Sequence, residues 1–160
     1  MWAPRGQTPV LKAPLSWKKM SVSAALAYRW DGQKARLMFR TTVGAYNGTK
    51  LVGFLRALKR EFKGRRVILV WDRLPAHRMG AVARWLPGQS AWLSATHLPA
   101  YCPELNPAEG VFGNYQGQEL AGLCVTDIRE KARHLRRGMR RIRNRQELLI
   151  SFLHHAGLFF

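Results

Sequence analysis

The pattern of apolar and polar positions predicts a β-hairpin near the start of the chain. Ser21–Tyr28 and Ala35–Val43 have the length and the apolar content of strands, and Asp31-Gly32 between them is a turn signal. Prolines and glycines interrupt residues 1–20, which we expect to be irregular.

A helix and a strand are predicted next. Asn47 or Thr49 could cap a helix in which apolar residues recur at spacings of four, three and four, at Leu51, Leu55, Leu58 and Phe62. Val67–Trp71 then places five apolar residues in a row, mostly β-branched or aromatic. Such a run predicts a strand that is buried on both faces, as in a parallel sheet.

The second half predicts one more strand and several helices. Arg78–Leu86 indicates a short helix and Ala91–Leu98 a strand. A helix start is predicted at Asn106, with Pro107 in its first turn and Glu109 completing a capping box. This order of elements favours an α/β class with a mixed sheet, and 160 residues without repeats or linkers favour a single domain over residues 1–160.

The C-terminal part, residues 126–158, is predicted to be helical and basic. Asp127 and Glu130 open a long helix with a narrow apolar stripe of Ile128, Ala132, Leu135, Met139 and Ile142. Asn144 and Glu147 repeat the capping pattern before a last helix over Leu148–Leu153.

Charge changes the functional picture most. Lys and Arg number 27 against nine Asp and Glu, which gives a net charge of +18. A chain this basic binds polyanions, and we favour nucleic acid over the alternative of a merely solvated surface. Basic residues are densest in the long C-terminal helix, at Arg129, Lys131, Arg133, Arg136, Arg137, Arg140, Arg141, Arg143 and Arg145.

Membrane and secretory features are not expected. The longest apolar runs are only a few residues, far short of the roughly 20 that a transmembrane helix needs, and we expect no signal peptide. Cys102 and Cys124 fit neither a disulfide framework nor a zinc motif, so we expect the reducing cytoplasm.

Two carboxylates could carry chemistry. Asp72 directly follows the Val67–Trp71 strand, where open α/β sheets bind ligands, although it could instead cap the next turn. From spacing alone, the capping box is the favoured explanation of Glu109. His77 could support a carboxylate that binds a metal, or it could face solvent. Together, the two acids could hold Mg²⁺ (or Mn²⁺) against phosphate, and two such ions could clamp a phosphodiester.

Five blocks in order along the chain resemble a known family. They are Trp2–Leu11, Trp71–Arg78, Leu98–Glu109, Glu119–Cys124 and Phe152–Leu158. They resemble the DDE endonuclease domain of insertion-sequence transposases of the mariner superfamily. The resemblance implies a ribonuclease H-like fold of the retroviral integrase type, with helices flanking a mixed sheet.

The resemblance also implies the chemistry. Asp72 matches the second catalytic Asp of the family and Glu109 its third acidic residue, with 36 residues between them. Both would bind metal, with His77 and Asn106 as supporting candidates. Water would attack the phosphodiester at the element's end, and the freed 3′-hydroxyl would attack target DNA. The implied partners are double-stranded DNA and a second copy of the chain. Candidate DNA contacts are Arg73, Arg78, Arg136, Arg140 and Arg143.

Four departures from the family limit these expectations. The family's first catalytic Asp precedes the Trp2–Leu11 block, and we expect it and the helix-turn-helix region to be absent here. Asp31 cannot replace that Asp, because it lies in the predicted hairpin turn. Phe112 and Gln116 stand where Trp and Lys are usual.

The strand that carries the first Asp lies mid-sheet in this fold, between the hairpin and Val67–Trp71. Either these two pair directly, or the chain needs an upstream-encoded polypeptide. We favour the second, in a fragment or the downstream frame of a split gene, and expect negligible DNA cleavage by the chain alone. The alternative is an inactive remnant that binds DNA non-specifically. An unrelated RNA-binding protein would explain the charge but not the ordered blocks.

Overall fold

The computed structural model describes Gly6 and residues 19–78, 80–120 and 127–159. Its strands are β1 Met20–Tyr28, β2 Ala35–Val43, β3 Val67–Trp71 and β4 Leu93–His97. Its α-helices are α1 Gly48–Glu61, α2 Pro75–Arg78, α3 Ala81–Trp85, α4 Pro107–Tyr115, α5 Ile128–Arg143 and α6 Gln146–His155. Short helical turns are η1 Leu86–Gln89, η2 Pro103–Leu105 and η3 Gln116–Leu120. The α/β class predicted from sequence is confirmed.

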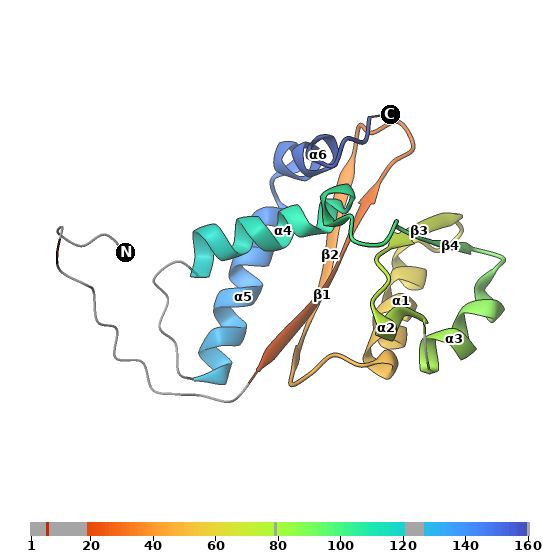
Figure 1. Ribbon diagram of the computed structural model, residues 1–160, viewed down its shortest axis with the longest axis horizontal. Coiled ribbons are helices and arrows are strands. Elements are labelled where there is room, and N and C mark those ends of the chain that lie inside the picture. The colour runs from red at the N-terminus through yellow and green to blue at the C-terminus, as the bar shows by residue number, and fades with distance from the viewer. Residues whose placement is uncertain (1–5, 7–18, 79, 121–126, 160) are drawn as a thin grey trace.

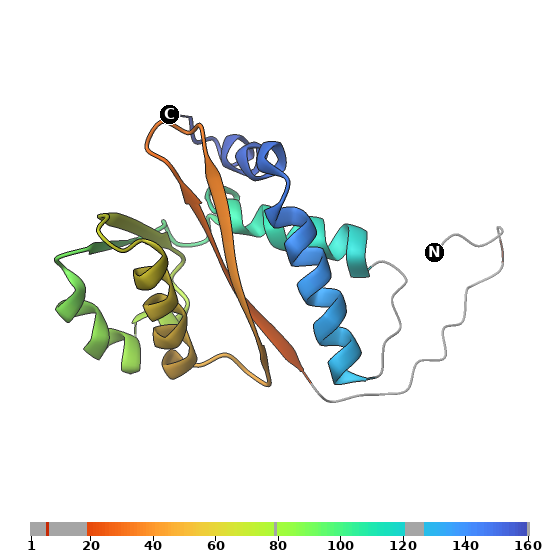
Figure 2. The ribbon, with the colours of Figure 1, turned by 180° about the vertical axis from the view of Figure 1, so that it is seen from behind.

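The β1–β2 hairpin separates two groups of elements. In Figures 1 and 2, α4, α5 and α6 lie on one side of it, and α1, α2, α3 and the β3–β4 pair lie on the other. The strands pair antiparallel, from Met20 opposite Val43 to Tyr28 opposite Ala35. Successive side chains of a strand point to opposite faces, so the hairpin can pack on both sides.

Two hydrophobic clusters use these two faces. Leu37 and Phe39 of β2 pack into the cluster that holds Met139 of α5 and Leu149 of α6. Met38, between them, packs into the other cluster with α1. The buried members of that second cluster are Leu51, Val52, Phe54, Leu55, Leu58, Trp71 and Val82. The hairpin is therefore the shared wall of both cores.

Three of the four helix caps predicted from the sequence are confirmed, at Asn47, Asn106 and Asp127. Asn47 caps α1 by accepting from the Lys50 N–H at 3.0 Å, and Asp127 caps α5 by accepting from the Glu130 N–H at 3.2 Å. Asn144 does not cap the last helix, so that prediction is wrong. It closes α5 instead, with its N–H donating to Arg140 O, and α6 begins after Arg145 without a side-chain cap.

The predicted Arg78–Leu86 helix is shorter in the structure, where α3 spans only Ala81–Trp85 and Arg78 is instead the last residue of α2. Gly80 has φ +60°, a conformation that L side chains rarely adopt, and it separates α2 from α3. A positive φ is incompatible with a continuous α-helix, so α3 begins only after Gly80, although the apolar pattern predicted an uninterrupted helix from Arg78.

The strands form two separate two-stranded sheets, β1–β2 and β3–β4. β3 and β4 are parallel, and Val67 lies opposite Leu93. The hairpin therefore does not pair with β3, which removes the first of the two alternatives raised by the sequence. The prediction that β3 is buried on both faces is wrong, because Ile68 and Val70 are 75% and 51% exposed. Among the described residues, nothing covers that face of the strand.

A polar contact joins the hairpin to the last helix. Tyr28 donates from its hydroxyl to Leu149 O at 2.9 Å. Burial raises the pKa of Tyr28 well above its ordinary value, so the neutral donor persists at any biological pH.

A close approach of α5 to α4 gives a stability prediction. A Cβ on Gly138 would lie 2.7 Å from two ring atoms of Tyr115, a buried residue, so Gly138→Ala should lower the free energy of unfolding by about 1–3 kcal/mol. Gly113→Ala is the matched control, because nothing lies within 4 Å of its Cβ. It should be neutral or stabilising by up to about 1 kcal/mol. Urea denaturation measures both, and equal effects would contradict the packing.

Candidate active site

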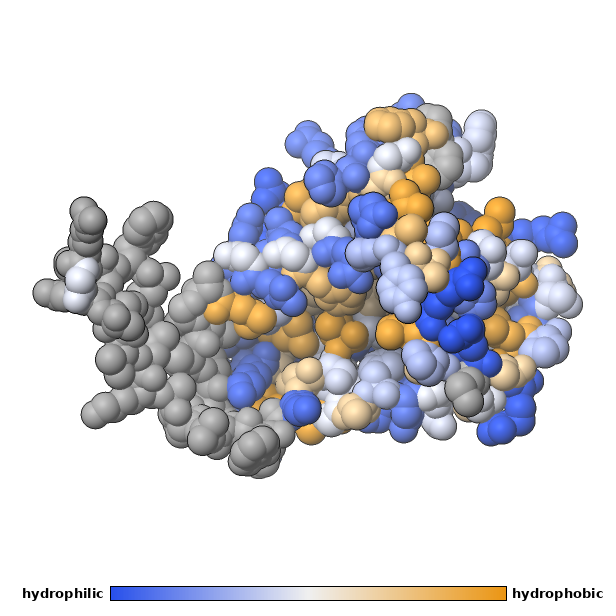
Figure 3. Space-filling model, viewed as in Figure 1, coloured by the Kyte–Doolittle hydropathy of each residue, from blue (hydrophilic) through white to orange (hydrophobic). Residues whose placement is uncertain are grey.

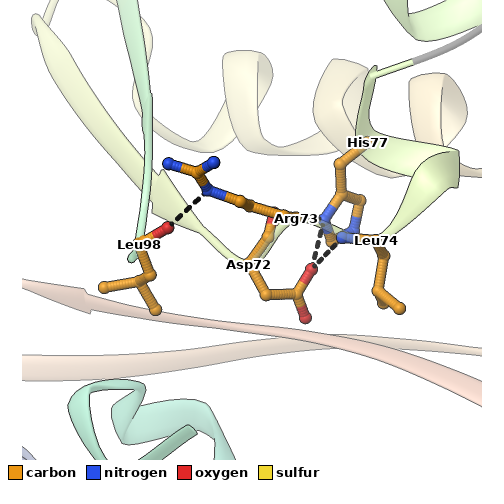
Figure 4. A network of polar contacts seen from close by, with 5 residues as sticks. All are labelled: Asp72, Arg73, Leu74, His77 and Leu98. Atoms are coloured by element: carbon orange, nitrogen blue, oxygen red, sulfur yellow. Dashed lines mark hydrogen bonds and ion pairs between the residues drawn. The ribbon is translucent and has the colours of Figure 1, made fainter. Parts of the chain in front are cut away.

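Asp72 lies directly after β3, at the edge of the sheet where the parallel strands β3 and β4 both end. Its Oδ1 accepts from the Leu74 N–H at 3.0 Å and lies 2.7 Å from His77 Nδ1 (Figure 4). His77 Nδ1 donates to the backbone carbonyl oxygen of Asp72 at 3.2 Å, since a carbonyl oxygen can only accept. The Leu74 N–H and the neighbouring imidazole, both from the same short turn, therefore hold the Asp72 carboxylate in place.

His77 is itself held by packing. Its ring stacks on the ring of Trp71, with centroids 4.6 Å apart and planes within 4°. Its side chain is 17% exposed, against 38% for Asp72. His77 therefore lies beside the carboxylate rather than facing solvent, while its role as a supporting residue stays a prediction.

The two oxygens of the Asp72 carboxylate differ in their contacts. The contact with Leu74 is the turn cap that the sequence raised as an alternative. It uses Oδ1 only, and no described residue donates a hydrogen bond to Oδ2. The cap and the ligand interpretations are therefore compatible.

The residue after Asp72 contacts the segment that connects β4 to α4. Arg73, the next residue, donates from Nε to Leu98 O at 3.0 Å (Figure 4), and the Leu98 N–H donates to Trp71 O at 2.8 Å. Residues 98–106 then carry the chain from β4 to the side of the hairpin where α4 lies (Figure 1). Figure 3 shows strongly hydrophilic side chains over the region between β3 and α2, and both Arg73 and Arg78 are exposed.

Glu109 lies in the first turn of α4 and is exposed. Asn106 is the cap, as predicted, because its side chain accepts from the Ala108 N–H at 3.1 Å. The second contact of the predicted capping box, from the Asn106 N–H to the Glu109 carboxylate, does not form, so that part of the prediction is wrong. The Asn106 N–H donates to Pro103 O at 2.9 Å, because the η2 turn supplies that acceptor. The Glu109 carboxylate is thus not used by the cap, which removes its structural explanation.

The remaining acids do not complete a metal site. Within the described part of the chain, no three or more His, Cys, Asp or Glu side chains form a group that could hold a metal ion. Asp31 lies in the hairpin turn and pairs with Arg29.

A basic hollow lies between α5 and β2, with a volume of about 390 Å³. Arg136, Arg140 and Arg143 line it, because their spacing of four and three places them on one helical face. Arg136 donates from Nε to Thr41 Oγ1 at 3.3 Å, and Arg143 lies 5.9 Å from the ring of Phe39. No local sequence pattern predicts these two β2 partners.

Arg40 also borders the hollow, but its side chain points to the opposite side of the hairpin. A Cβ on Gly53 of α1 would lie 3.1 Å from Arg40 Nη1. Alternation along β2 explains this, because Phe39 and Thr41 face α5. No described acid pairs with Arg136, Arg140 or Arg143, whereas Arg141 of the same helix pairs with Glu119. We call Phe39, Thr41, Arg136, Arg140 and Arg143 the α5 groove.

Comparison with known proteins identifies the family. The sequence profile described as DDE superfamily endonuclease matches residues 1–129. The chain belongs to this family. No curated protein sequence matches it.

The fold is that of the Mos1 transposase catalytic domain. The chain is 20% identical to Mos1 transposase in its paired-end complex with the left transposon end, covering 98% of this chain and 46% of that one, with a TM-score of 0.66. The chain is also 20% identical to the Mos1 strand transfer complex, and the match covers 100% of this chain and 50% of that one, with a TM-score of 0.56. It is 16% identical to the catalytic domain of Mos1 mariner transposase, and the match covers 88% of this chain and 83% of that one, with a TM-score of 0.52.

These likenesses confirm the ribonuclease H-like fold predicted from the sequence. The chain spans about half the length of the Mos1 transposase chains in the two complexes. None of its described helices is long and apolar enough to cross a membrane.

The two functions of Asp72 can be separated by substitution. Asp72→Asn keeps an oxygen for the Leu74 N–H and removes the charge beside His77, whereas Asp72→Ala removes both. We expect Asp72→Ala to cost about 0.5–1.5 kcal/mol of unfolding free energy and Asp72→Asn less. Glu109→Gln should stay within about 0.5 kcal/mol of the parent chain, because no described residue bonds that carboxylate. Thermal denaturation measures all three, and equal losses for both Asp72 variants would contradict a turn role.

Proposed function

We propose that the chain contributes Asp72 and Glu109 to the active site of a DDE transposase, which cleaves DNA phosphodiesters and transfers strands. One observation carries the proposal. In a chain of this family, Asp72 is held by Leu74 and His77 at the carboxyl edge of β3–β4 and keeps one oxygen without a described donor. Glu109 is exposed and is not used by the cap of its helix.

The residues fit Mg²⁺ or Mn²⁺. Both ions prefer oxygen ligands, and two carboxylates with unused oxygens are a suitable donor set. A solved structure of a related catalytic domain contains Mn. When bound, the metal ions would act as Lewis acids toward the attacking and leaving oxygens of the phosphodiester. His77 would keep the Asp72 carboxylate oriented, in the way that outer partners orient metal ligands.

The site needs a further carboxylate. The described residues offer no group of three metal-binding side chains, so we infer that a third acid comes from outside them. Upstream sequence or another polypeptide could supply it. On this basis the chain alone should cleave DNA negligibly. An inactive remnant that only binds DNA is the second candidate function, and the same observation favours it.

The substrate would be double-stranded DNA, at the ends of an element and at its target. The net charge of +18 supports this, as do the Mos1 neighbours, which were solved as a complex with a transposon end and as a strand transfer complex. Arg73 and Arg78 would contact phosphates near Asp72, and the α5 groove would contact them elsewhere. Two element ends must be held together, so a homodimer is part of the proposal.

Metal binding tests the two acids directly. Mn²⁺ titration followed by calorimetry should show weak binding to the 160-residue chain and at least about tenfold weaker binding to Asp72→Asn and Glu109→Gln. Glu104→Gln is the control, because Glu104 is an exposed acid in the segment before α4. Unchanged binding by the first two variants would remove both residues from the site.

Cleavage of plasmid DNA separates the two candidate functions. Nicking that requires Mg²⁺ or Mn²⁺ and disappears in Asp72→Ala would show that the chain assembles a working site and would contradict the need for a third acid. If the chain joined to its upstream sequence also fails to nick, the remnant interpretation holds.

Salt dependence of DNA affinity tests the α5 groove. Each phosphate contact contributes about 0.9 to the slope of log K against log salt, so replacing Arg136, Arg140 and Arg143 by Ala should reduce the slope by up to about 2.7. The matched control removes three exposed charges elsewhere, at Arg56, Arg60 and Arg65. Fluorescence anisotropy with a labelled duplex gives both slopes. Equal reductions would show that charge alone matters, and the groove would then have no special role.

A further inference from the structure

Tyr101 is the most exposed large apolar side chain of the described residues, with its side chain 100% exposed. It is also the only described residue other than glycine with a positive φ, at 59°. Left-handed backbone is unfavourable for a residue with a bulky side chain, and such strain clusters at ligand-binding sites. Because Tyr101 is fully exposed, no packing of its ring within the described residues compensates for this unfavourable backbone conformation.

The segment that carries Tyr101 is hydrogen-bonded to β3 and Arg73 on one side and enters a helical turn on the other. Before it, Leu98 accepts from Arg73 Nε and donates to Trp71 O. After it, the Leu105 N–H donates to Cys102 O at 3.2 Å. Pro99 and Pro103 flank it and restrict the backbone further. Tyr101 is therefore presented by a stiff turn, so little conformational entropy would be lost when its ring binds a ligand.

The position of the turn indicates what the ring would meet. Tyr101 follows Leu98 by three residues, which limits the separation of their Cα atoms to about 11 Å. Leu98 in turn contacts Arg73, the residue after Asp72 (Figure 4). The ring is thus tethered to the edge of the sheet that carries the candidate catalytic carboxylate. The nearby exposed cations, Arg73 and Arg78, favour a polyanion there.

We propose that Tyr101 stacks on a DNA base next to the phosphodiester that undergoes chemistry, and so positions that strand. The inference rests on the proposed function and adds a recognition residue to it. Every base has a π-face, so an aromatic platform can hold a base of an unpaired or frayed strand whatever its sequence. Arginine contacts to phosphates cannot fix the strand in this way, because they leave the base free to rotate.

The test uses DNA duplexes with an unpaired end and 2-aminopurine at successive positions. Binding of the parent chain should quench the fluorescence at one or two positions. Tyr101→Gly should lose the quenching and bind about 5- to 150-fold more weakly, as expected for the loss of one stacked base. Tyr101→Phe should retain both, since it keeps the ring.

Stability separates stacking from a structural role. Glycine accepts a φ of 59° without strain, so Tyr101→Gly should leave the melting temperature unchanged or raise it while binding falls. Trp30→Gly is the matched control, because Trp30 is 84% exposed next to the hairpin turn, and it should leave binding and quenching unchanged.

Three results would overturn the inference. The first is Tyr101→Gly binding and quenching like Tyr101→Phe. The second is an equal loss of binding in Trp30→Gly. The third is a change in sedimentation of Tyr101→Gly with no change in quenching, because the ring would then dock a second copy of the chain. If the parent chain does not bind DNA, the proposed function itself fails, and the inference fails with it.

Discussion

The packing of both faces of one hairpin is the constraint on which the rest of the structure depends. β1 and β2 form only a two-stranded ribbon, which is marginal in water without partners. Leu37 and Phe39 pack with α4, α5 and α6, and Met38 packs with α1. A shift of one residue in register would exchange these faces and disrupt both clusters at once. The hairpin register therefore fixes the elements that carry the two candidate acids, since Asp72 follows β3 on one side of the hairpin and Glu109 lies in α4 on the other.

Within that frame, the Asp72 turn depends on a short chain of contacts. Trp71 is buried in the α1 cluster, His77 stacks on Trp71, and the imidazole contacts Asp72. The rings of His77 and Trp71 thus connect the orientation of the Asp72 carboxylate to the hydrophobic core. Arg73 extends the same chain to Leu98 and so to the segment that leads to α4. A perturbation of the core near Trp71 should therefore reach the site even without touching its acids.

Local sequence patterns predicted most helices and strands, whereas features that depend on contacts between distant residues could not be predicted from them. The hairpin, α1 and α5 followed from apolar spacing and from the caps Asn47 and Asp127, which are local interactions. The burial of β3 could not follow from its composition, because it depends on which strand lies beside it. For the site, spacing and resemblance pointed to Asp72, Glu109 and His77. The contacts of Thr41 with Arg136 and of Arg73 with Leu98 join residues 95 and 25 positions apart, which no local pattern reports.

Charge connects the candidate site to the proposed substrate. Asp31, Glu61 and Glu119 are engaged by arginines, so part of a small acidic complement is already neutralised within the fold. The α5 groove arginines have no such partner among the described residues and remain available to phosphate. Asp72 and Glu109 are among the acids without an arginine partner in the described part of the chain, as are Glu104 and Glu147. Bare carboxylates repel a phosphodiester, and under the proposed function a divalent cation at Asp72 and Glu109 would remove that repulsion.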